Sequence, residues 1–343
     1  MENESKKVIV AMSGGVDSSV SAALLKRTGF DVVGVFMKLT NTENLKESEN
    51  RARKIAKILK IPFFVFDLRK EFKNKIIQYF IKEYMLGNTP NPCVVCNKEI
   101  KFKFLTEKAK ELKADFIATG HYAKIKKSNN LYKIIRPKDE KKDQTYFLWK
   151  LSQEEIKKII FPVEDYKKDE IKLISDNFKL YLSKIPESQE ACFIKDDLVN
   201  FLKKYIKPKP GKIIDKNGTI LGKHKGLIFY TIGQRKGIGL AGGPYFVFLK
   251  DQKKNNLIVT KNEKDLYKKE TKIKDVNWVA EKVKMPTNVL AQIRYRHKPT
   301  RAKIYQVKED IRVVFNKPQK SVTSGQSLVF YKGNELLGGG IIV

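Results

Sequence analysis

The stretch "VIVAMSGGVDSS", residues 8–19, joins a short apolar run to a glycine-rich turn. The apolar run is typical of a buried strand, and "VSAALLKRTG" (20–29) continues as a helix that ends at a glycine. Gly14 and Gly15 let the backbone turn tightly, so that successive N–H groups can face one anion. The following helix N-terminus and the hydroxyls of the turn favour the same ligand. This stretch predicts a phosphate site after the first strand.

The turn differs from an ordinary P-loop, because no lysine follows its glycines. The dinucleotide pattern G-x-G-x-x-G does not occur at this turn either. The pattern S-G-G-x-D-S at residues 13–18 resembles the loop of enzymes that split ATP into AMP and pyrophosphate. Such enzymes place AMP on a carbonyl oxygen and so make that oxygen a leaving group. A chance Ser-Gly-Gly turn is the alternative, and the strand–helix context disfavours it.

The alternation of strand and helix continues along the first part of the chain. Further strands are predicted at 31–38, 63–68 and 115–121, and further helices at 43–60, 71–86 and 99–112. This alternation predicts an α/β fold, a doubly wound parallel sheet with helices on both faces. Ligands of such sheets bind at the carboxyl ends of the strands. The glycine turn, "FMK" and "TGH" all lie at strand ends of this kind.

The pattern changes after about residue 150. The segment 151–182 predicts two helices broken at Pro162, and "KPKPG" (207–211) predicts a linker or domain entry. "KIIDKNGTILG" (212–222) predicts a hairpin with an Asn-Gly turn. From about residue 270 short alternating strands predict a small β-barrel or sandwich.

The charge of the chain indicates a polyanionic partner. There are 70 Lys and Arg against 38 Asp and Glu, which gives a net charge of +32. Nucleic acid is the partner that such a charge favours, although a lysine-rich genome would contribute part of it. No apolar run is long enough to span a bilayer, and "MENESKK" lacks a signal-peptide core. With only three cysteines, we expect a cytoplasmic protein that does not bind membranes.

Two cysteines, Cys93 and Cys96, lie in "NPCVVCNKEIKFKF", and Cys192 is far along the chain. A Cys-x-x-C pair supplies two zinc ligands, but no second pair follows. The other candidate ligands for a structural zinc are Cys192 and the three histidines: His121, His224 and His297.

A second interpretation gives these thiols a redox or nucleophilic role. The alternative to it is that the cysteines are buried and chemically inert. Cys96 is predicted near a helix N-terminus with Lys98 and Lys101 close by, and both features favour thiolate. Beside an ATP site that makes a leaving group, a thiolate or persulfide could attack the activated carbon. A second cysteine, with Cys192 as the candidate partner, could then resolve the intermediate by exchange.

The chain resembles the bacterial tRNA-specific 2-thiouridylases, PP-loop ATPases that thiolate the wobble uridine. The matching stretches follow the family's order: "VIVAMSGGVDSSV", "FMK", "TPNPCVVCNKEIKFK", "ATGHY", "KDQTYFL", "ACFI", "PGKII", "GLIFYTIGQRKGIGL", "RYR", "SGQSLVFY" and "LGGGII". The resemblance implies a PP-loop catalytic domain of the adenine-nucleotide alpha-hydrolase type over 1–196, a small central domain over 197–268 and a C-terminal β-barrel over 269–343.

The resemblance also implies roles for individual residues. The implied ATP phosphate loop is Ala11, Met12, Ser13, Gly14, Gly15, Val16, Asp17 and Ser18. The implied adenosine pocket contains Met37 and Gly120, and the implied contacts with the target base are Asn91, Pro92 and Cys93. The implied tRNA contacts are His121, Lys142, Asp143, Gln144, Arg294, Tyr295 and Gln326. Cys96 stands at the family's nucleophile and Cys192 at its persulfide-carrying cysteine.

The implied activity is that of a tRNA-uridine 2-sulfurtransferase. ATP with Mg²⁺ would adenylate the C2 oxygen of the wobble uridine, and sulfur from Cys192 would displace AMP. Cys96 would then close a disulfide with Cys192, which requires residues 183–195 to be mobile without tRNA. A sulfur-relay protein or cysteine desulfurase is the implied partner besides tRNA.

Cys93 departs from the family pattern, because many members carry an aspartate at this position. Together with Cys96 and Cys192 it could instead hold a [4Fe-4S] cluster with one iron open to sulfide. Two further interpretations stay open: a PP-loop ligase of a small metabolite, and a non-catalytic RNA-binding protein with a decayed ATP loop. The intact glycine turn disfavours the second.

Overall fold

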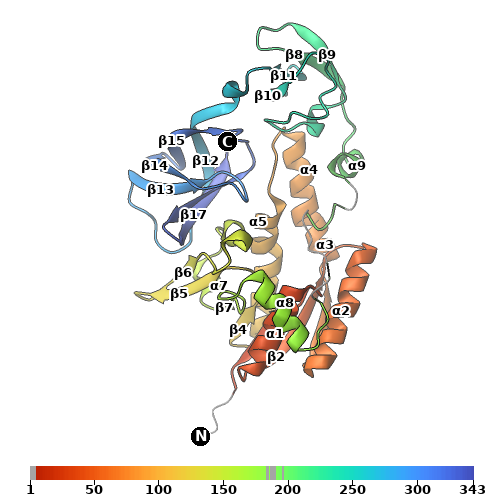
Figure 1. Cartoon of the computed structure of the whole chain (residues 1–343), viewed down its shortest axis with the longest axis vertical. Coiled ribbons are helices and arrows are strands. Elements are labelled where there is room, and N and C mark those ends of the chain that lie inside the picture. Colours follow the sequence, from red (N-terminus) through yellow and green to blue (C-terminus); the bar gives the residue numbers. More distant parts are fainter. Residues whose placement is uncertain (1–4, 183–184, 186–190, 195–196) are drawn as a thin grey trace.

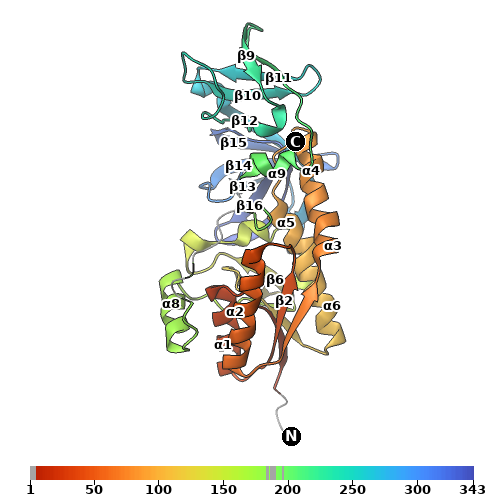
Figure 2. The ribbon, with the colours of Figure 1, turned by 90° about the vertical axis from the view of Figure 1, so that its right-hand side faces the viewer.

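The computed structural model describes residues 5–182, 185, 191–194 and 197–343. It contains three sheets, one in each of three parts stacked along the long axis (Figures 1 and 2). The N-terminal part carries a five-stranded sheet of order β3-β2-β1-β4-β7 in which every neighbouring pair is parallel. The doubly wound parallel sheet is confirmed.

The elements of the N-terminal part alternate as expected. The strands are β1 Lys7–Ala11, β2 Asp31–Lys38, β3 Phe63–Asp67, β4 Phe116–Ala118 and β7 Ile159–Ile160, with α1 Val16–Arg27 and α2 Glu43–Leu59 between the first three. The helical stretch after β3 comprises α3 Arg69–Phe72, a π-helical segment Lys73–Ile77 and α4 Gln78–Met85. The stretch before β4 comprises α5 Pro92–Cys96, a π-helical segment Asn97–Phe102 and α6 Lys103–Glu111.

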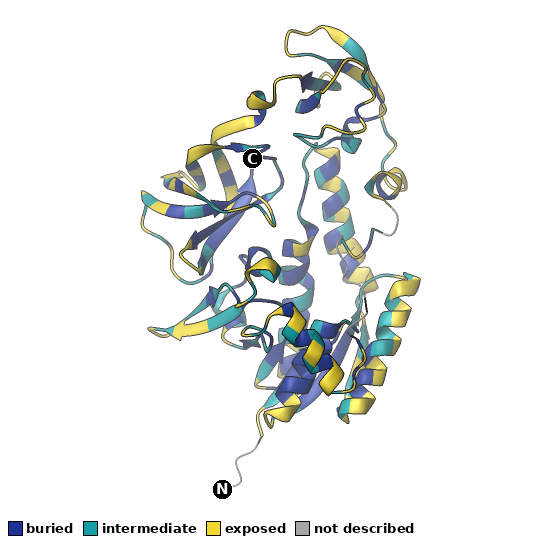
Figure 3. Cartoon of the chain, viewed as in Figure 1, coloured by how far each residue is buried: buried dark blue, intermediate teal, exposed yellow. Residues whose placement is uncertain are grey.

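The two faces of the sheet are covered by different helices. Val8 and Val10 pack with α1 and α2 residues, whereas Ile9 belongs to a second core with Phe102 and Leu105. Successive strand side chains point to opposite faces, so an apolar run such as 8–12 is buried on both sides. Figure 3 shows that α2 keeps an exposed outer face.

The prediction of two helices over 151–182 is wrong in its first half. The helix α7 (Gln153–Ile156) is a single turn closed by a capping box of Ser152 and Glu155. Ile159 and Ile160 then form β7, which pairs with Ile117 and Ala118 of β4. An edge strand buries this apolar pair and satisfies its backbone groups on β4, which outweighs helix continuation. Only the second helix, α8 (Lys168–Asn177), forms as expected.

The central part has α9 (Leu198–Lys203) and a four-stranded sheet of order β10-β11-β8-β9. Its strands are β8 Gly211–Ile214, β9 Ile220–His224, β10 Phe246–Asp251 and β11 Asn256–Thr260. The predicted hairpin is confirmed, since β8 and β9 pair antiparallel and Asp215 accepts hydrogen bonds from the N–H groups of Asn217 and Thr219.

The C-terminal part is a six-stranded barrel, closed because β12 pairs with both β15 and β17. Its strands are β12 Tyr267–Trp278, β13 Thr287–Gln292, β14 Thr300–Val307, β15 Asp310–Lys320, β16 Ser327–Lys332 and β17 Glu335–Ile342. A hairpin of the N-terminal part, β5 Lys124–Ser128 and β6 Leu131–Ile135, extends this sheet by pairing with β17. Short 3₁₀ turns lie at Glu140–Lys142, Thr145–Phe147, Leu227–Phe229 and Glu263–Leu266.

The barrel and the N-terminal part share one core. Trp149 is fully buried, and its indole N–H donates to the Ser327 hydroxyl at 3.1 Å. The Tyr146 hydroxyl donates to the Ser327 carbonyl at 2.8 Å, and the Asn277 amide donates to the Trp149 carbonyl at 2.6 Å. Within the described ranges, no helix has the length and apolarity that crossing a bilayer requires.

Candidate active site

The glycine loop lies between β1 and α1, at the carboxyl edge of the sheet. Gly14 has a φ of +76°, and a Cβ there would lie 2.2 Å from the Ser48 carbonyl oxygen. The Ser13 N–H donates to the Ser18 hydroxyl at 3.1 Å, which folds the turn back on the first turn of α1. The Arg51 guanidinium donates to the Gly14 carbonyl at 3.2 Å. The loop therefore opens onto the α1 N-terminus, as a phosphate site requires.

Asp17, in the first turn of α1, has both carboxylate oxygens engaged by protein groups. The Lys168 ammonium lies 2.7 Å from each oxygen, and the Tyr122 hydroxyl donates to one of them at 2.8 Å. Sequence reasoning missed Lys168, because it lies 151 residues away within a run of charged residues that is typical of a solvated helix end. Asp17 thus anchors α1 to the N-terminal end of α8.

The predicted adenosine residues lie at the same edge as the loop. Ala11 ends β1, Met37 lies near the end of β2, and Gly120 follows β4. A Cβ on Gly120 would lie 2.6 Å from the Ser18 nitrogen, so the chain after β4 runs directly against the start of α1. These positions agree with a nucleotide that spans the ends of the first, second and fourth strands. Their roles stay predictions.

The three thiols lie near one aromatic cluster of the N-terminal part. Cys96 is buried in a cluster of aromatic rings that includes Phe80 and Phe193, whose centroids are 5.2 Å apart. Phe193 directly follows Cys192, so its burial places Cys192 on the same cluster as Cys96. Cys93 and Cys192 are exposed, and all three cysteines are free thiols.

The expectation of a thiolate at Cys96 is wrong for this structure. Burial raises the pKa of the Cys96 thiol to about 12, although Lys101 acts to lower it. Cys96 ends α5 rather than beginning it, so it lies outside the first turn where the helix dipole acts. The Lys98 ammonium is 2.6 Å from the Glu155 carboxylate, a partner that competes with the sulfur. Cys93 and Cys192 keep exposed side chains, but the protein packed around them partly desolvates their sulfurs, and this raises the pKa of both thiols, against Lys101.

Lys101 is the charge that the three thiols share. Burial alone would lower the pKa of its ammonium, but the sulfurs of Cys96, Cys93 and Cys192 raise it and determine the net direction. Lys101 is therefore a cation whose charge acts on the thiols of Cys93, Cys96 and Cys192. It favours whichever of them loses a proton.

His121 follows β4, with its ring near Phe102 and Phe161 at centroid distances of 5.8 and 6.1 Å. Its Nδ1 lies 2.8 Å from the Thr119 hydroxyl. Burial and the Lys101 charge lower the pKa of His121 to about 3. This imidazole is therefore neutral at physiological pH.

The three thiols do not fit a metal site as they are arranged. Among the residues that the structure describes, no group of three or more His, Cys, Asp or Glu side chains could hold a metal ion. His224 lies in the central part and His297 follows the barrel strand β13. We therefore derive no step through an iron–sulfur cluster.

The implied base contacts and the barrel meet at one junction. Asn91 caps α5 by accepting the Cys93 N–H at 3.2 Å, with Pro92 at the first helical position. The Gln326 amide donates to the Thr89 carbonyl at 2.6 Å, and the Thr89 N–H donates to the Ser324 carbonyl at 2.9 Å. The barrel thus fixes the segment that leads into Cys93.

Two further implied tRNA contacts lie at this junction. Tyr295 packs on Phe147 with ring centroids 4.4 Å apart, and Arg294 is exposed beside it. Asp143 is mostly engaged within the protein, by Arg136 at 2.9 Å and the Thr145 N–H at 2.9 Å. The predicted mobile segment 183–195 falls largely outside the described residues.

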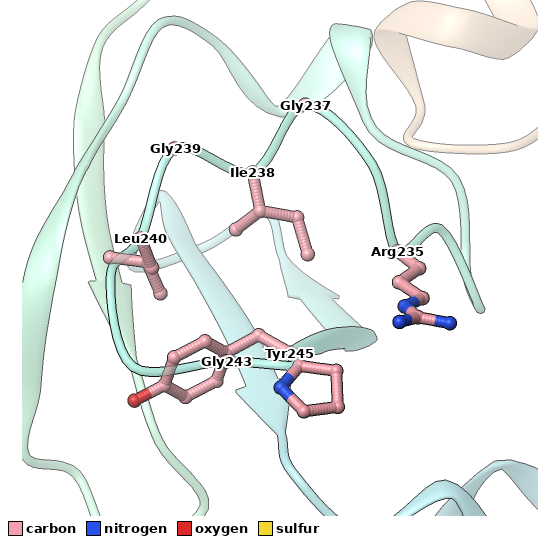
Figure 4. Close-up of a pocket in the computed structure, with 8 residues that line it drawn as sticks. Arg235, Gly237, Ile238, Gly239, Leu240, Gly243 and Tyr245 are labelled. Atoms are coloured by element: carbon pink, nitrogen blue, oxygen red, sulfur yellow. The ribbon is translucent and has the colours of Figure 1, made fainter.

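Two cavities accompany the site. One of about 860 Å³ lies beyond the ends of β2 and β3 and is lined by Arg69, Lys70, Phe193 and Phe201, among others. The second, of about 470 Å³, lies in the central part, where Arg235, Ile238 and Tyr245 surround it (Figure 4). The first adjoins the thiols through Phe193.

Comparison with known proteins covers nearly the whole chain. Residues 6–196 match a family model described as a tRNA methyl transferase HUP domain, residues 199–261 a tRNA methyl transferase PRC-barrel domain, and residues 268–342 an aminomethyltransferase beta-barrel domain. A relative named tRNA-specific 2-thiouridylase MnmA from Clostridioides difficile (strain 630) is 45% identical over 353 residues, with 98% of each chain covered.

Another relative of that name, from Clostridium acetobutylicum, is 46% identical over 354 residues and covers 98% of this chain and 99% of its own. Among solved structures, the U34-tRNA thiolase NcsA from Methanococcus maripaludis with its [4Fe-4S] cluster aligns at 23% identity and a TM-score of 0.38, over 54% of this chain and 60% of its own. Matching nearly end to end at such identity, this chain belongs to the tRNA-specific 2-thiouridylase family.

Proposed function

We propose that this chain is an ATP-dependent tRNA-uridine 2-sulfurtransferase that replaces the C2 oxygen of the wobble uridine by sulfur. The observation that carries this proposal is one domain that presents a phosphate-type glycine loop and three free thiols, with Cys96 and the neighbours of Cys192 in one aromatic cluster. The full-length similarity to relatives named 2-thiouridylases supports it.

The first step is docking of tRNA. The net charge of +32 attracts phosphates, and the exposed Arg294 beside Tyr295 offers a cation and a ring for stacking. The C2 carbonyl of a stacked base is out of reach, so the base must be extruded toward Asn91 and Cys93. The junction of the barrel with the segment 89–93 is the place where both requirements meet.

The second step activates the base with ATP, which enters as its magnesium complex. The uracil C2 oxygen attacks the α-phosphorus, an O–P bond forms, and the bond to the β-phosphate oxygen breaks as pyrophosphate leaves. Loop N–H groups and the α1 N-terminus stabilise the phosphate charge. Asp17 contributes by holding α1 in place, since both of its oxygens are engaged by Lys168 and Tyr122.

The third step transfers sulfur from a persulfide on Cys192. The terminal sulfur attacks C2 and AMP departs with the former carbonyl oxygen, leaving the base joined to Cys192 through two sulfurs. Cys96 then attacks the Cys192 sulfur, which releases the 2-thiouridine and forms a disulfide. A thiol reductant must return two electrons to reopen it. The persulfide sulfur would come from a relay protein or cysteine desulfurase.

Deprotonation of Cys96 needs help from the site. Its pKa of about 12 keeps the thiol protonated at neutral pH, and Lys101 is the group that acts against this. We assign Lys101 the stabilisation of the thiolate that forms during exchange. We also propose that the domains span 1–196, 197–268 and 269–343, and that the enzyme works in the cytoplasm with its tRNA.

The test is a single-turnover assay with ATP, magnesium, unmodified tRNA and a persulfide donor, in which AMP and 2-thiouridine are both measured. Cys96→Ser and Cys192→Ser should abolish 2-thiouridine while AMP formation survives. Cys93→Ser is the matched control, and it should keep some thiolation in the persulfide route. Normal thiolation by either of the first two variants, or thiolated product without AMP, would refute the proposal.

The same assay separates the alternatives. A cluster-dependent route predicts loss of thiolation in all three Ser variants, together with iron and sulfide in anaerobically purified protein. A ligase of a small metabolite predicts AMP release that does not depend on tRNA. Replacing Arg294 by Gln should weaken tRNA binding and lower its salt slope by about one. Lys26→Gln, at the far end of α1 from the loop, serves as the control.

A further inference from the structure

Two side chains hold the Asp17 carboxylate, and both are buried. The Lys168 side chain is 8% exposed and places its ammonium 2.7 Å from each carboxylate oxygen. Tyr122 is 3% exposed and donates its hydroxyl to the same carboxylate at 2.8 Å. Lys168 and Tyr122 are buried and the Asp17 side chain is 29% exposed, so the carboxylate is held from the protein side by an ammonium on both of its oxygens and by a hydroxyl on one. The position of Asp17 is therefore set by Lys168 and Tyr122.

The backbones of these two residues bind the two ends of one surface segment, residues 139–144. At its start, the Asp139 carboxylate accepts the Lys168 N–H at 2.9 Å. At its end, the Gln144 side chain accepts the Tyr122 N–H at 2.9 Å, and the Gln144 N–H donates to the Tyr122 carbonyl at 3.0 Å. The segment, the two clamp residues and Asp17 thus form a closed circuit of hydrogen bonds.

The segment is stiff between its ends. Asp139 also caps the 3₁₀ turn at Glu140–Lys142 by accepting the Lys141 N–H at 3.1 Å. Asp143 is paired with Arg136, whose own N–H donates to the Asn334 carbonyl of the barrel at 2.9 Å. A displacement of the turn that carries Lys141 and Lys142 is therefore passed to the ends of the segment rather than absorbed within it.

The other side of the circuit is the nucleotide loop. Asp17 and Ser18 begin α1, and Gly120, two residues before Tyr122, runs against them so closely that a Cβ would lie 2.7 Å from the Asp17 carbonyl carbon. The Ser18 hydroxyl accepts the Ser13 N–H. A shift of Tyr122 or Lys168 would hence move the N–H groups that face a phosphate.

We infer that Tyr122 and Lys168 are positioning residues that couple RNA docking on segment 139–144 to nucleotide binding in the glycine loop. The inference rests on the proposed function, which supplies tRNA and ATP as the two ligands. A ligand that stabilises the closed circuit of hydrogen bonds lowers the free-energy cost of ordering it when the second ligand binds. Thermodynamic linkage makes this effect on the two affinities reciprocal. ATP thereby binds more tightly when RNA is in place.

The experiment measures the affinity of a non-hydrolysable ATP analogue, with magnesium, in the absence and presence of saturating unmodified tRNA. We expect the wild-type chain to bind the analogue about fivefold or more tightly with tRNA. Tyr122→Phe removes only the hydroxyl and should bring this ratio close to one. Tyr181→Phe, which changes an exposed tyrosine of the same domain, should keep the wild-type ratio.

Lys168 gives a second, independent arm. Lys168→Met should also bring the ratio close to one, whereas Lys168→Arg keeps a cation against Asp17 and should recover part of it. Melting temperatures identify any variant that fails to fold, and Tyr122→Phe keeps the ring and its packing. A full wild-type ratio in folded Tyr122→Phe would overturn the inference.

The outcomes also separate this inference from the proposed function. A wild-type ratio of one, with both ligands bound, would overturn the coupling and leave the sulfurtransferase intact. Failure of the wild-type chain to bind either ATP or tRNA would overturn both. A purely structural role for Tyr122 would lower stability while leaving the ratio of the two affinities unchanged.

Discussion

The three thiols differ in exposure, and the charge of Lys101 acts to lower the pKa of each of them. Cys93 and Cys192 are exposed, whereas Cys96 is 5% exposed among aromatic rings. Desolvation raises the pKa of all three thiols, and that of Cys96 to about 12. A thiol kept in its protonated form resists adventitious oxidation, because the thiolate is the reactive species.

The ligand-free enzyme should therefore be alkylated in a fixed order. Iodoacetamide at about pH 8 should modify Cys93 and Cys192 before Cys96, which should react roughly tenfold or more slowly because little thiolate is present. Because the pKa values lie above the usual value of about 8.5, raising the pH to about 10 should still accelerate the two exposed thiols. Peptide mass spectrometry over time measures each rate.

Lys101 provides the matched variants for this experiment. Lys101→Met removes the charge that lowers the thiol pKa values, so alkylation should slow at all three positions. Lys103→Met, on the exposed face two residues along, should leave the rates unchanged. Faster alkylation of Cys96 than of Cys192 would show that the buried thiol is already ionised, against the structure.

His121 predicts a dependence of stability on pH. Burial, with Lys101, lowers its pKa to about 3 in the folded chain, against 6.5 as the ordinary value. Between these values the unfolded chain binds one more proton, so stability present above pH 6.5 is lost as the pH falls toward 3. The slope from this residue is about 1.4 kcal/mol per pH unit.

Urea unfolding of the wild-type chain and of His121→Gln at several pH values isolates this contribution. Carboxylates contribute to both chains alike, so the difference in unfolding free energy should shrink as the pH falls below about 6.5. Identical pH profiles for the two chains would mean that His121 binds its proton equally well in the folded and the unfolded chain, against the lowered pKa.

At the scale of elements, the contact between α1 and the chain after β4 constrains where the loop ends and the helix begins. A Cβ on Gly120 would meet backbone atoms of Ser18 and Asp17 at 2.6 and 2.7 Å, and backbone cannot rotate away as a side chain can. Gly120→Ala should hence displace the start of α1 and weaken binding of an ATP analogue by about tenfold or more.

Gly29, at the other end of α1, is the matched control for Gly120. Its φ is +88° and no atom lies within 4 Å of an added Cβ. Gly29→Ala should cost about 1 kcal/mol of stability through backbone strain and leave nucleotide affinity unchanged. If calorimetric titration gave the two variants equal affinities, the proposed role of this contact would be wrong.

Helices and strands with a clear hydrophobic pattern could be predicted from the sequence. Short elements, and elements that form only by pairing with a distant part of the chain, could not. Val8, Ile9 and Val10 form an uninterrupted apolar run that only a strand buried on both faces explains. Ile159 and Ile160 form a strand only because β4 is there to pair with them. The hairpin at 124–135 had a usable signal, since Asn129 and Asn130 both adopt positive φ in its turn.

The same division holds for the site. The glycine loop is a local motif, and its turn and position could be predicted. The Lys168–Asp17 pair has no local signal, because tertiary folding alone brings α8 to α1. The prediction of a thiolate at Cys96 was wrong for a similar reason. Phe193 and its neighbours bury the thiol, and this burial depends on the whole fold. It raises the pKa of Cys96 by more than nearby lysines lower it.

At the scale of the whole molecule, the N-terminal domain and the barrel share a core, whereas the central domain has its own. Trp149 packs with the barrel residues Val329, Tyr331 and Leu336. Gly339 lets β17 approach the indole, since a Cβ there would lie 3.1 Å from the ring. The central sheet instead buries residues such as Leu257 in a separate cluster.

Trp149→Ala should therefore destabilise both of the parts that it joins. We expect a loss of about 3–5 kcal/mol, because the indole is fully buried and leaves a cavity. Hydrogen exchange read separately in β1 and in β15 should accelerate by a similar factor, since both strands open in the same unfolding event. Leu257→Ala is the control, and its effect should be confined to residues 211–260. If Trp149→Ala accelerated exchange only in the barrel, the two parts would unfold independently, and RNA held at their junction could not rely on a fixed geometry between Gln326 and Thr89.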